Sequence, residues 1–115
     1  VHILSLPNSQ DCVIALPPSG LMGGFLRVVK KAAGISVVLT DTPENILNRI
    51  AFYDIDSRLI EKRLTQKEKH LYLREIKKDI TYFRKTYDRA DMQVDISGLD
   101  AEYSAEKVER SIEEN

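Results

Sequence analysis

The basic side chains in the second half of the sequence are the residues best suited to bind a charged ligand. Residues 58–89 contain 11 basic and 5 acidic side chains, although the formal net charge of the whole chain is only -1. Arg58 lies close in sequence to Lys62 and Arg63. Arg84 carries a planar guanidinium, which can hold a carboxylate through two parallel hydrogen bonds. This pattern predicts attraction of an anion such as phosphate or carboxylate, but a solvated charged helix has the same composition.

The sequence lacks the loop with which P-loop enzymes hold a nucleotide. No G-x-x-x-x-G-K-[ST] motif occurs in the 115 residues. Residues 20–24 are rich in glycine and begin a predicted helix, but the lysine and the hydroxyl residue that would contact phosphate and Mg²⁺ are missing. We therefore predict that residues 20–24 form a loop-to-helix junction, and that this chain does not bind ATP or Mg²⁺ tightly.

Disulfide and zinc chemistry are also excluded by the residue types. Cys12 is the single cysteine, and His2 and His70 are the two histidines, so neither an internal disulfide nor a zinc site is expected. We predict that Cys12 packs as a small hydrophobe and that the chain holds no metal. His70 is assigned no role, because it lies off the apolar stripe of its helix. The cysteine usage fits a reducing cytoplasm.

These side chains must be positioned by alternating strands and helices. Short apolar runs predict three buried strands, and periodic apolar residues predict four helices. The order predicts an α/β fold with a mostly parallel three-stranded sheet and flanking helices, in a single domain covering residues 1–115. Residues 53–64 lack an apolar period and predict a mobile, lid-like loop. The predicted strands are 12–16, 35–40 and 92–96, and the predicted helices are Leu21–Ala33, one passing through Ile46 and Ile50, one from a Thr65–Glu68 capping box to Tyr87, and one capped by Ser104.

Several short pieces of sequence occur in an order and spacing typical of one enzyme family. In chain order they are Ala15-Leu16, Val37–Leu39, Thr42–Glu44, Ile46–Ile50, Ser57–Leu59, Arg84–Tyr87, Ala90-Asp91, Val94-Asp95 and Ser97–Leu99. Together they resemble the C-terminal half of shikimate kinase, a P-loop small-molecule kinase of the nucleoside-monophosphate-kinase group. The resemblance covers residues 12–114 and depends on the joint order of the pieces, since no single piece is specific.

The resemblance implies an ATP-dependent phosphotransferase that acts on a hydroxyl of a small carboxylated substrate in aromatic amino acid biosynthesis. It implies a catalytic role for Arg58, in a lid that closes over ATP. It implies that Arg84 binds the substrate carboxylate, and that Ser97 and Gly98 belong to the cofactor-binding loop near adenine. ATP and Mg²⁺ are the cofactors of the intact family.

Two departures from the family pattern bear on activity. The family's three consecutive glycines are replaced by Pro17-Pro18-Ser19, and proline offers neither the flexibility nor the N–H donor that would contact shikimate hydroxyls. The P-loop half is absent from the sequence. We therefore predict that this chain alone is inactive. The alternatives are a non-catalytic binding or interaction module of the same fold, and a basic-helix protein that binds anions or RNA, for which charge is the only argument.

The same resemblance predicts that the sheet needs a partner. The composition, 43% hydrophobic and 30% charged, is that of a folded protein, and no apolar stretch is long enough to span a membrane. In the family, the P-loop strand lies between the strands equivalent to residues 12–16 and 35–40, so its absence leaves backbone groups unpaired. We expect the chain to self-associate, to pair with a missing N-terminal half, or to rearrange so that its strands pair directly.

Overall fold

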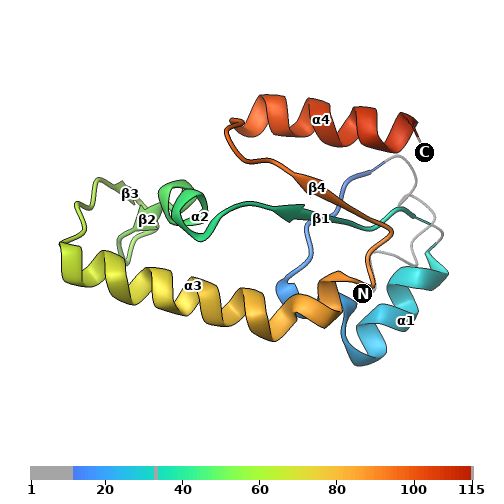
Figure 1. Cartoon of the computed structure of the whole chain (residues 1–115), viewed down its shortest axis with the longest axis horizontal. Coiled ribbons are helices and arrows are strands. Elements are labelled where there is room, and N and C mark those ends of the chain that lie inside the picture. Colours follow the sequence, from blue (N-terminus) through green and yellow to red (C-terminus); the bar gives the residue numbers. More distant parts are fainter. Residues whose placement is uncertain (1–11, 33, 115) are drawn as a thin grey trace.

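The computed structural model describes residues 12–32 and 34–114, and over these residues the chain is an α/β protein (Figure 1). This part contains four α-helices, one short 3-10 helix and two separate two-stranded sheets. No helix within it is long and apolar enough to cross a membrane. In chain order the elements are η3 (Pro18–Leu21), α1 (Gly23–Lys31), β1 (Val37–Thr40), α2 (Pro43–Arg49), β2 (Phe52–Tyr53), β3 (Leu59–Ile60), α3 (Gln66–Tyr87), β4 (Met92–Asp95) and α4 (Ala101–Glu113).

The central feature is the parallel pairing of β1 with β4. The two strands lie side by side, with Val37 opposite Met92 and Thr40 opposite Asp95. β1 is rich in β-branched residues, which pack well on a pleated surface. In Figure 1 the strand pair runs between α4 on one side and α3 on the other, which is the layering of an α/β protein. The two later strands predicted from the sequence are confirmed, at slightly shorter lengths.

The predicted three-stranded sheet is wrong. Residues 12–16 form no strand, and both Cys12 and Val13 are exposed instead of packed. The chain then turns into η3, where the N–H of Gly20 donates to the carbonyl of Pro17 at 2.8 Å. A short apolar run becomes a strand only when a neighbouring strand accepts its backbone hydrogen bonds. Within the described residues no strand pairs with residues 12–16.

The segment predicted as a lid-like loop, residues 53–64, contains most of a short hairpin. β2 pairs antiparallel with β3. The Asp54 carboxylate closes the turn, because its Oδ1 accepts hydrogen bonds from the N–H groups of Asp56 and Arg58, both at 2.9 Å. Strands of two residues are too short to show an alternating apolar pattern, so the sequence did not reveal this hairpin.

Helix α3 begins at the predicted capping box. Thr65 Oγ1 accepts from the N–H of Glu68 at 3.1 Å, and Glu68 Oε1 accepts from the N–H of Thr65 at 3.2 Å. The hairpin contacts the first half of this helix, where the rings of Phe52 and Tyr72 meet edge to face at 5.8 Å. With 22 residues, α3 is a rod about 33 Å long, along which the hairpin and the rest of the fold are arranged.

The buried apolar core is small. Among the described residues it consists of Leu21, Leu47, Val94 and Ile96. These side chains come from η3, from α2, and from β4 with the loop that follows it. The core therefore follows β4 more closely than β1.

The last helix begins earlier than predicted, and Ser104 is not its cap. The N-cap of α4 is Asp100, whose Oδ1 accepts from the N–H of Tyr103 at 2.8 Å. Ser104 lies one turn inside the helix and is buried, with 7% of its surface exposed. Its Oγ has no hydrogen-bond partner among the described residues. Both residues are of capping type, so the sequence alone offered two possible starts for this helix.

Replacement of the buried serine by alanine is expected to stabilise the protein. A buried hydroxyl without a partner costs roughly 1 to 3 kcal/mol, and alanine has the higher helix propensity, so Ser104→Ala should raise the free energy of unfolding by about 1 kcal/mol. Urea denaturation measures the difference. Ser111→Ala is the control, because Ser111 Oγ donates to the carbonyl of Lys107 at 2.8 Å. An unchanged or less stable Ser104→Ala protein would contradict this prediction.

Candidate functional site

The structure places the two arginines of the predicted site far apart. Arg58 lies in the turn of the β2–β3 hairpin, which sits beside the start of α3 (Figure 1). Arg84 lies in the last turn of α3 and is exposed. Arg84 is 12 positions beyond Tyr72, where the hairpin contacts the helix, which corresponds to about 18 Å along the helix axis. The two guanidinium groups are therefore not brought to one ligand site in this conformation.

Ser97 and Gly98 lie together in the loop that follows β4. Asp95 Oδ1 accepts from both the N–H of Ser97 at 2.9 Å and its hydroxyl at 2.7 Å. The hydrogen bond from the Ser97 hydroxyl contributes most, and that from the Ser97 N–H contributes next, to holding the pKa of Asp95 below its ordinary value. Gly98 has a φ of +77°, a left-handed conformation that side chains rarely adopt. The loop is thus a defined turn at the carboxyl end of a parallel strand.

The residue that fixes this loop, Arg49, was missed in the sequence. Its Nη2 donates to the carbonyls of Ile96 at 2.8 Å and Leu99 at 2.7 Å, at the two ends of the loop. Its Nε donates to Asp41 Oδ2 at 2.9 Å. One sequence signal could have revealed this interaction: a carboxylate, Asp41, stands just before α2, and an arginine, Arg49, stands in the last turn of that short helix. Arg49 therefore joins the carboxyl ends of both strands.

Asp41, the partner of Arg49, is a nearly buried carboxylate that accepts three hydrogen bonds. Its side chain is 3% exposed, and it accepts from the N–H of Thr42 at 2.7 Å and from Asn45 Nδ2 at 2.8 Å as well as from Arg49. Burial alone would raise its pKa. The donors of Asn45, Thr42 and Arg49 together outweigh burial, so the pKa of Asp41 lies below its ordinary value of 3.8 and the group stays ionised.

The carboxyl ends of β1 and β4 form the best candidate for a binding site. In open α/β sheets, ligands bind outside the carboxyl ends of the strands. Here that edge carries the ordered loop at Ser97 and Gly98, and the negative charges of Asp41 and Asp95, which lie close enough for Asp41 to raise the pKa of Asp95 in part. The guanidinium of Arg49 and the ammonium of Lys107 lie at the same edge and offset these two negative charges, so formal charge alone does not select the sign of a ligand there. No cluster that could hold a metal ion occurs within residues 12–32 and 34–114.

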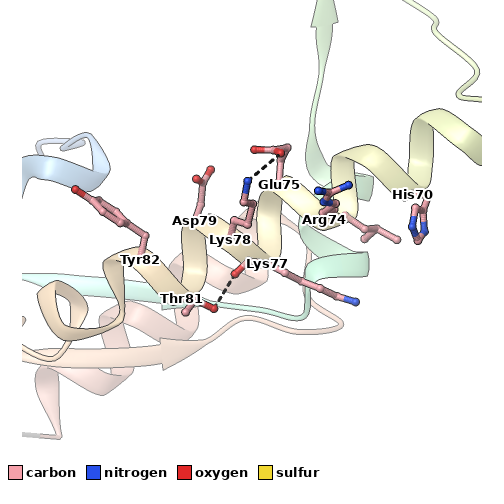
Figure 2. A pocket seen from close by; sticks show the side chains of 9 residues that line it. His70, Arg74, Glu75, Lys77, Lys78, Asp79, Thr81 and Tyr82 are labelled. Carbon is pink, nitrogen blue, oxygen red and sulfur yellow. Dashed lines mark hydrogen bonds and ion pairs between the residues drawn. The ribbon is translucent and has the colours of Figure 1, made fainter.

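An open hollow of about 830 Å³ runs along α3, but its lining argues against a ligand site (Figure 2). All of its lining residues belong to this one helix, so a ligand would be contacted from a single side. Its charges are mixed, and Lys78 Nζ lies 3.8 Å from Glu75 Oε1. It contains none of the four predicted site residues. The charged residues that line it are Arg74, Glu75, Lys77, Lys78 and Asp79.

A polar cluster joins the opposite, amino-terminal ends of the two strands. Asp91 Oδ2 accepts from the N–H of Ser36 at 2.7 Å and from its hydroxyl at 3.0 Å. Ser36 Oγ in turn accepts from the N–H of Asp91 at 2.9 Å. The hydrogen bond from the Ser36 N–H contributes most, and that from the Ser36 hydroxyl contributes next, to holding the pKa of Asp91 below its ordinary value. This cluster joins β1 to β4 and leaves no free donor for a ligand on its two side chains.

Comparison with known proteins identifies no relative of this chain. No model of a known protein family, no curated protein and no solved structure matches this chain. The resemblance to shikimate kinase therefore stays a prediction from the order and spacing of the sequence elements.

The depressed pKa of Asp41 predicts an acid-dependent contribution to stability. Because the folded-state pKa lies below 3.8, the ionised carboxylate contributes stability that is fully present above that value and is lost as the pH falls through the folded-state pKa. Asp41→Asn should therefore melt at a lower temperature than the unchanged chain near neutral pH, with the two midpoints converging in acid. Thermal denaturation at a series of pH values tests this. Asp56→Asn, at an exposed turn, is the control and should leave the dependence of the melting midpoint on pH unchanged. A difference in midpoint between Asp41→Asn and the unchanged chain that stays the same at every pH would contradict the prediction.

Arg49→Ala is expected to loosen the loop after β4. Two carbonyls lose their donor, and a lost hydrogen bond to a charged group costs about 2 kcal/mol, so the free energy of unfolding should fall by at least that amount. Hydrogen exchange at residues 97–99 should accelerate more than exchange in α3. Arg110→Ala, at an exposed position of α4, is the matched control. Equal stability of the Arg49→Ala and Arg110→Ala proteins would show that the loop does not depend on Arg49.

Proposed function

We propose that this chain is the C-terminal part of a phosphotransferase that resembles shikimate kinase. The supporting observation is the parallel pairing of β1 with β4, with the ordered Ser97–Gly98 loop at their shared carboxyl ends. Together with a half that carries the P-loop, the protein would pass the γ-phosphate of ATP, held with Mg²⁺, to a hydroxyl of a small carboxylated substrate. This chain alone would be inactive, because its sequence contains no P-loop.

Within this proposal, each part of the site has a distinct task. The Ser97–Gly98 loop would contact the uncharged base of the nucleotide, as the resemblance implies. Arg84 would hold the substrate carboxylate through its planar fork. Arg58 would stabilise the charge of the transferred phosphoryl group, and reaching the same ligand as Arg84 would require the β2–β3 hairpin to shift along α3.

A specific observation supports the alternative, a non-catalytic binding or interaction module. The turn that replaces the family's three glycines has two prolines, which have no N–H. The N–H of Gly20 donates to Pro17 within the chain, and the N–H of Met22 donates to the carbonyl of Ser19 at 3.0 Å. These backbone groups are not available to the hydroxyls of a substrate, so substrate recognition at this turn would differ from the family's or be lost.

Reconstitution of activity tests the proposal. The purified chain alone should release no ADP in a shikimate-dependent manner. Mixed with the P-loop half of a shikimate kinase, it should give measurable turnover in a coupled ADP assay. A stable complex without turnover would contradict the phosphotransferase proposal and favour the non-catalytic module.

Arginine variants of the reconstituted protein separate the two proposed roles. Arg84→Ala should raise the KM for shikimate at least about tenfold, because the carboxylate loses a bidentate partner, whereas Arg58→Ala should lower kcat with little change in KM. Arg74→Ala, at another exposed position of α3, is the matched control and should change neither constant. Equal effects of Arg84→Ala and Arg74→Ala would show that Arg84 does not bind the substrate.

A further inference from the structure

The outer edge of β1 is open over the described residues. The N–H of Met92 donates to the carbonyl of Ser36 at 3.1 Å, and the N–H of Ile96 donates to the carbonyl of Thr40 at 2.9 Å. In a parallel ladder, alternate residues face the partner strand, so the backbone groups of Val37 and Leu39 face away from β4. No other strand in the described part of the chain pairs with them.

The side chains next to this edge are incompletely covered. Leu39 lies directly beside Val94 in the ladder, yet Leu39 is 54% exposed whereas Val94 is 4% exposed. Ile35, two residues before Val37 and just outside the strand, is 55% exposed. Parallel sheets are normally buried on both faces. Among residues 12–32 and 34–114, the side chains that cover the sheet therefore leave β1 partly exposed at its open edge.

The two edges of the sheet differ in how they are protected. At β4, Lys107 Nζ donates to the carbonyl of Asp95 at 2.5 Å, and Gln93 Nε2 donates to Asp88 Oδ1 at 3.2 Å. For β1 the described part of the chain gives no such contact, and residues 35–40 contain neither a charged side chain nor proline. Edge strands of soluble proteins are usually guarded by lysine, proline or a covering element. An unguarded apolar edge is a template for pairing with another strand.

We propose that a second copy of this chain pairs with β1 through its own β1, in an antiparallel arrangement about a two-fold axis. A two-fold contact places the same surface patch on both partners, and this edge is uncharged, so it does not repel its copy. Centred on Val38, the arrangement sets Val37 opposite Leu39 of the other copy. It allows about four new backbone hydrogen bonds and covers both leucines, giving a continuous sheet in the order β4-β1-β1-β4. This proposal does not require the proposed enzymatic function. It concerns the chain without its P-loop half, because in the proposed enzyme the P-loop strand would occupy this same edge of β1.

The molecular mass in solution tests the pairing. The chain should sediment with about twice the 13.1 kDa mass of one copy, and the dimer should persist at high salt, because apolar contacts and backbone hydrogen bonds are screened little. Leu39→Lys places a charge at the edge and should give monomers. Ile55→Lys, at a residue that is 99% exposed in the hairpin, is the matched control and should remain dimeric.

A second variant controls for loss of the dimer through misfolding of the Leu39→Lys protein. Val37→Pro removes an N–H that faces away from β4, so it should also abolish the dimer while leaving helix content by circular dichroism unchanged. In the unchanged chain, the amides of Val37 and Leu39 should exchange slowly in the dimer and rapidly after dilution to monomers. A monomer at all concentrations, association that disappears at high salt, or a dimer that survives both substitutions would overturn the proposal.

Discussion

The parallel ladder between β1 and β4 is the interaction on which the rest of the structure depends. It joins residues 37–40 to residues 92–95 and is the only parallel pairing among the described residues. Each strand has only four residues, so the ladder itself offers few hydrogen bonds. Polar clusters at both ends compensate for this shortness. Ser36 and Asp91 join the amino ends of the strands, and Arg49 joins the carboxyl ends through the loop after β4.

This way of holding the strands limits the chemistry that the chain can perform by itself. Three hydrogen bonds donated by Arg49 and three accepted by Asp41 are used within the fold, so both groups serve mainly to hold the strand ends and the loop together. What remains at the carboxyl edge is an ordered loop flanked by charges of both signs. Such an edge can position a neutral group but supplies no cradle for phosphate. The candidate site is therefore a partial site, which agrees with the absence of a P-loop from the sequence.

Elements with strong local signals were predictable, and elements that depend on distant partners were not. The capping box at Thr65 and Glu68 is local, because both hydrogen bonds join residues three positions apart. Residues 12–16 have the apolar pattern of a strand but no partner strand, so they do not form one. Asp100 and Ser104 are both residues of capping type. In the structure Asp100 caps α4, and Ser104 is buried one turn inside the helix.

The amino-acid sequence by itself determined the α/β class, the positions of β1, α3 and β4, and the absence of a P-loop, because periodicity, capping and motif are properties of neighbouring residues. Arg58, Arg84, Ser97 and Gly98 could be named from the sequence, but their distances could not. Only the tertiary structure decided that the two arginines lie apart along α3, and that Arg49 clamps the loop after β4. The physical reason is that such contacts join residues about fifty positions apart, and their geometry depends on how the whole chain packs.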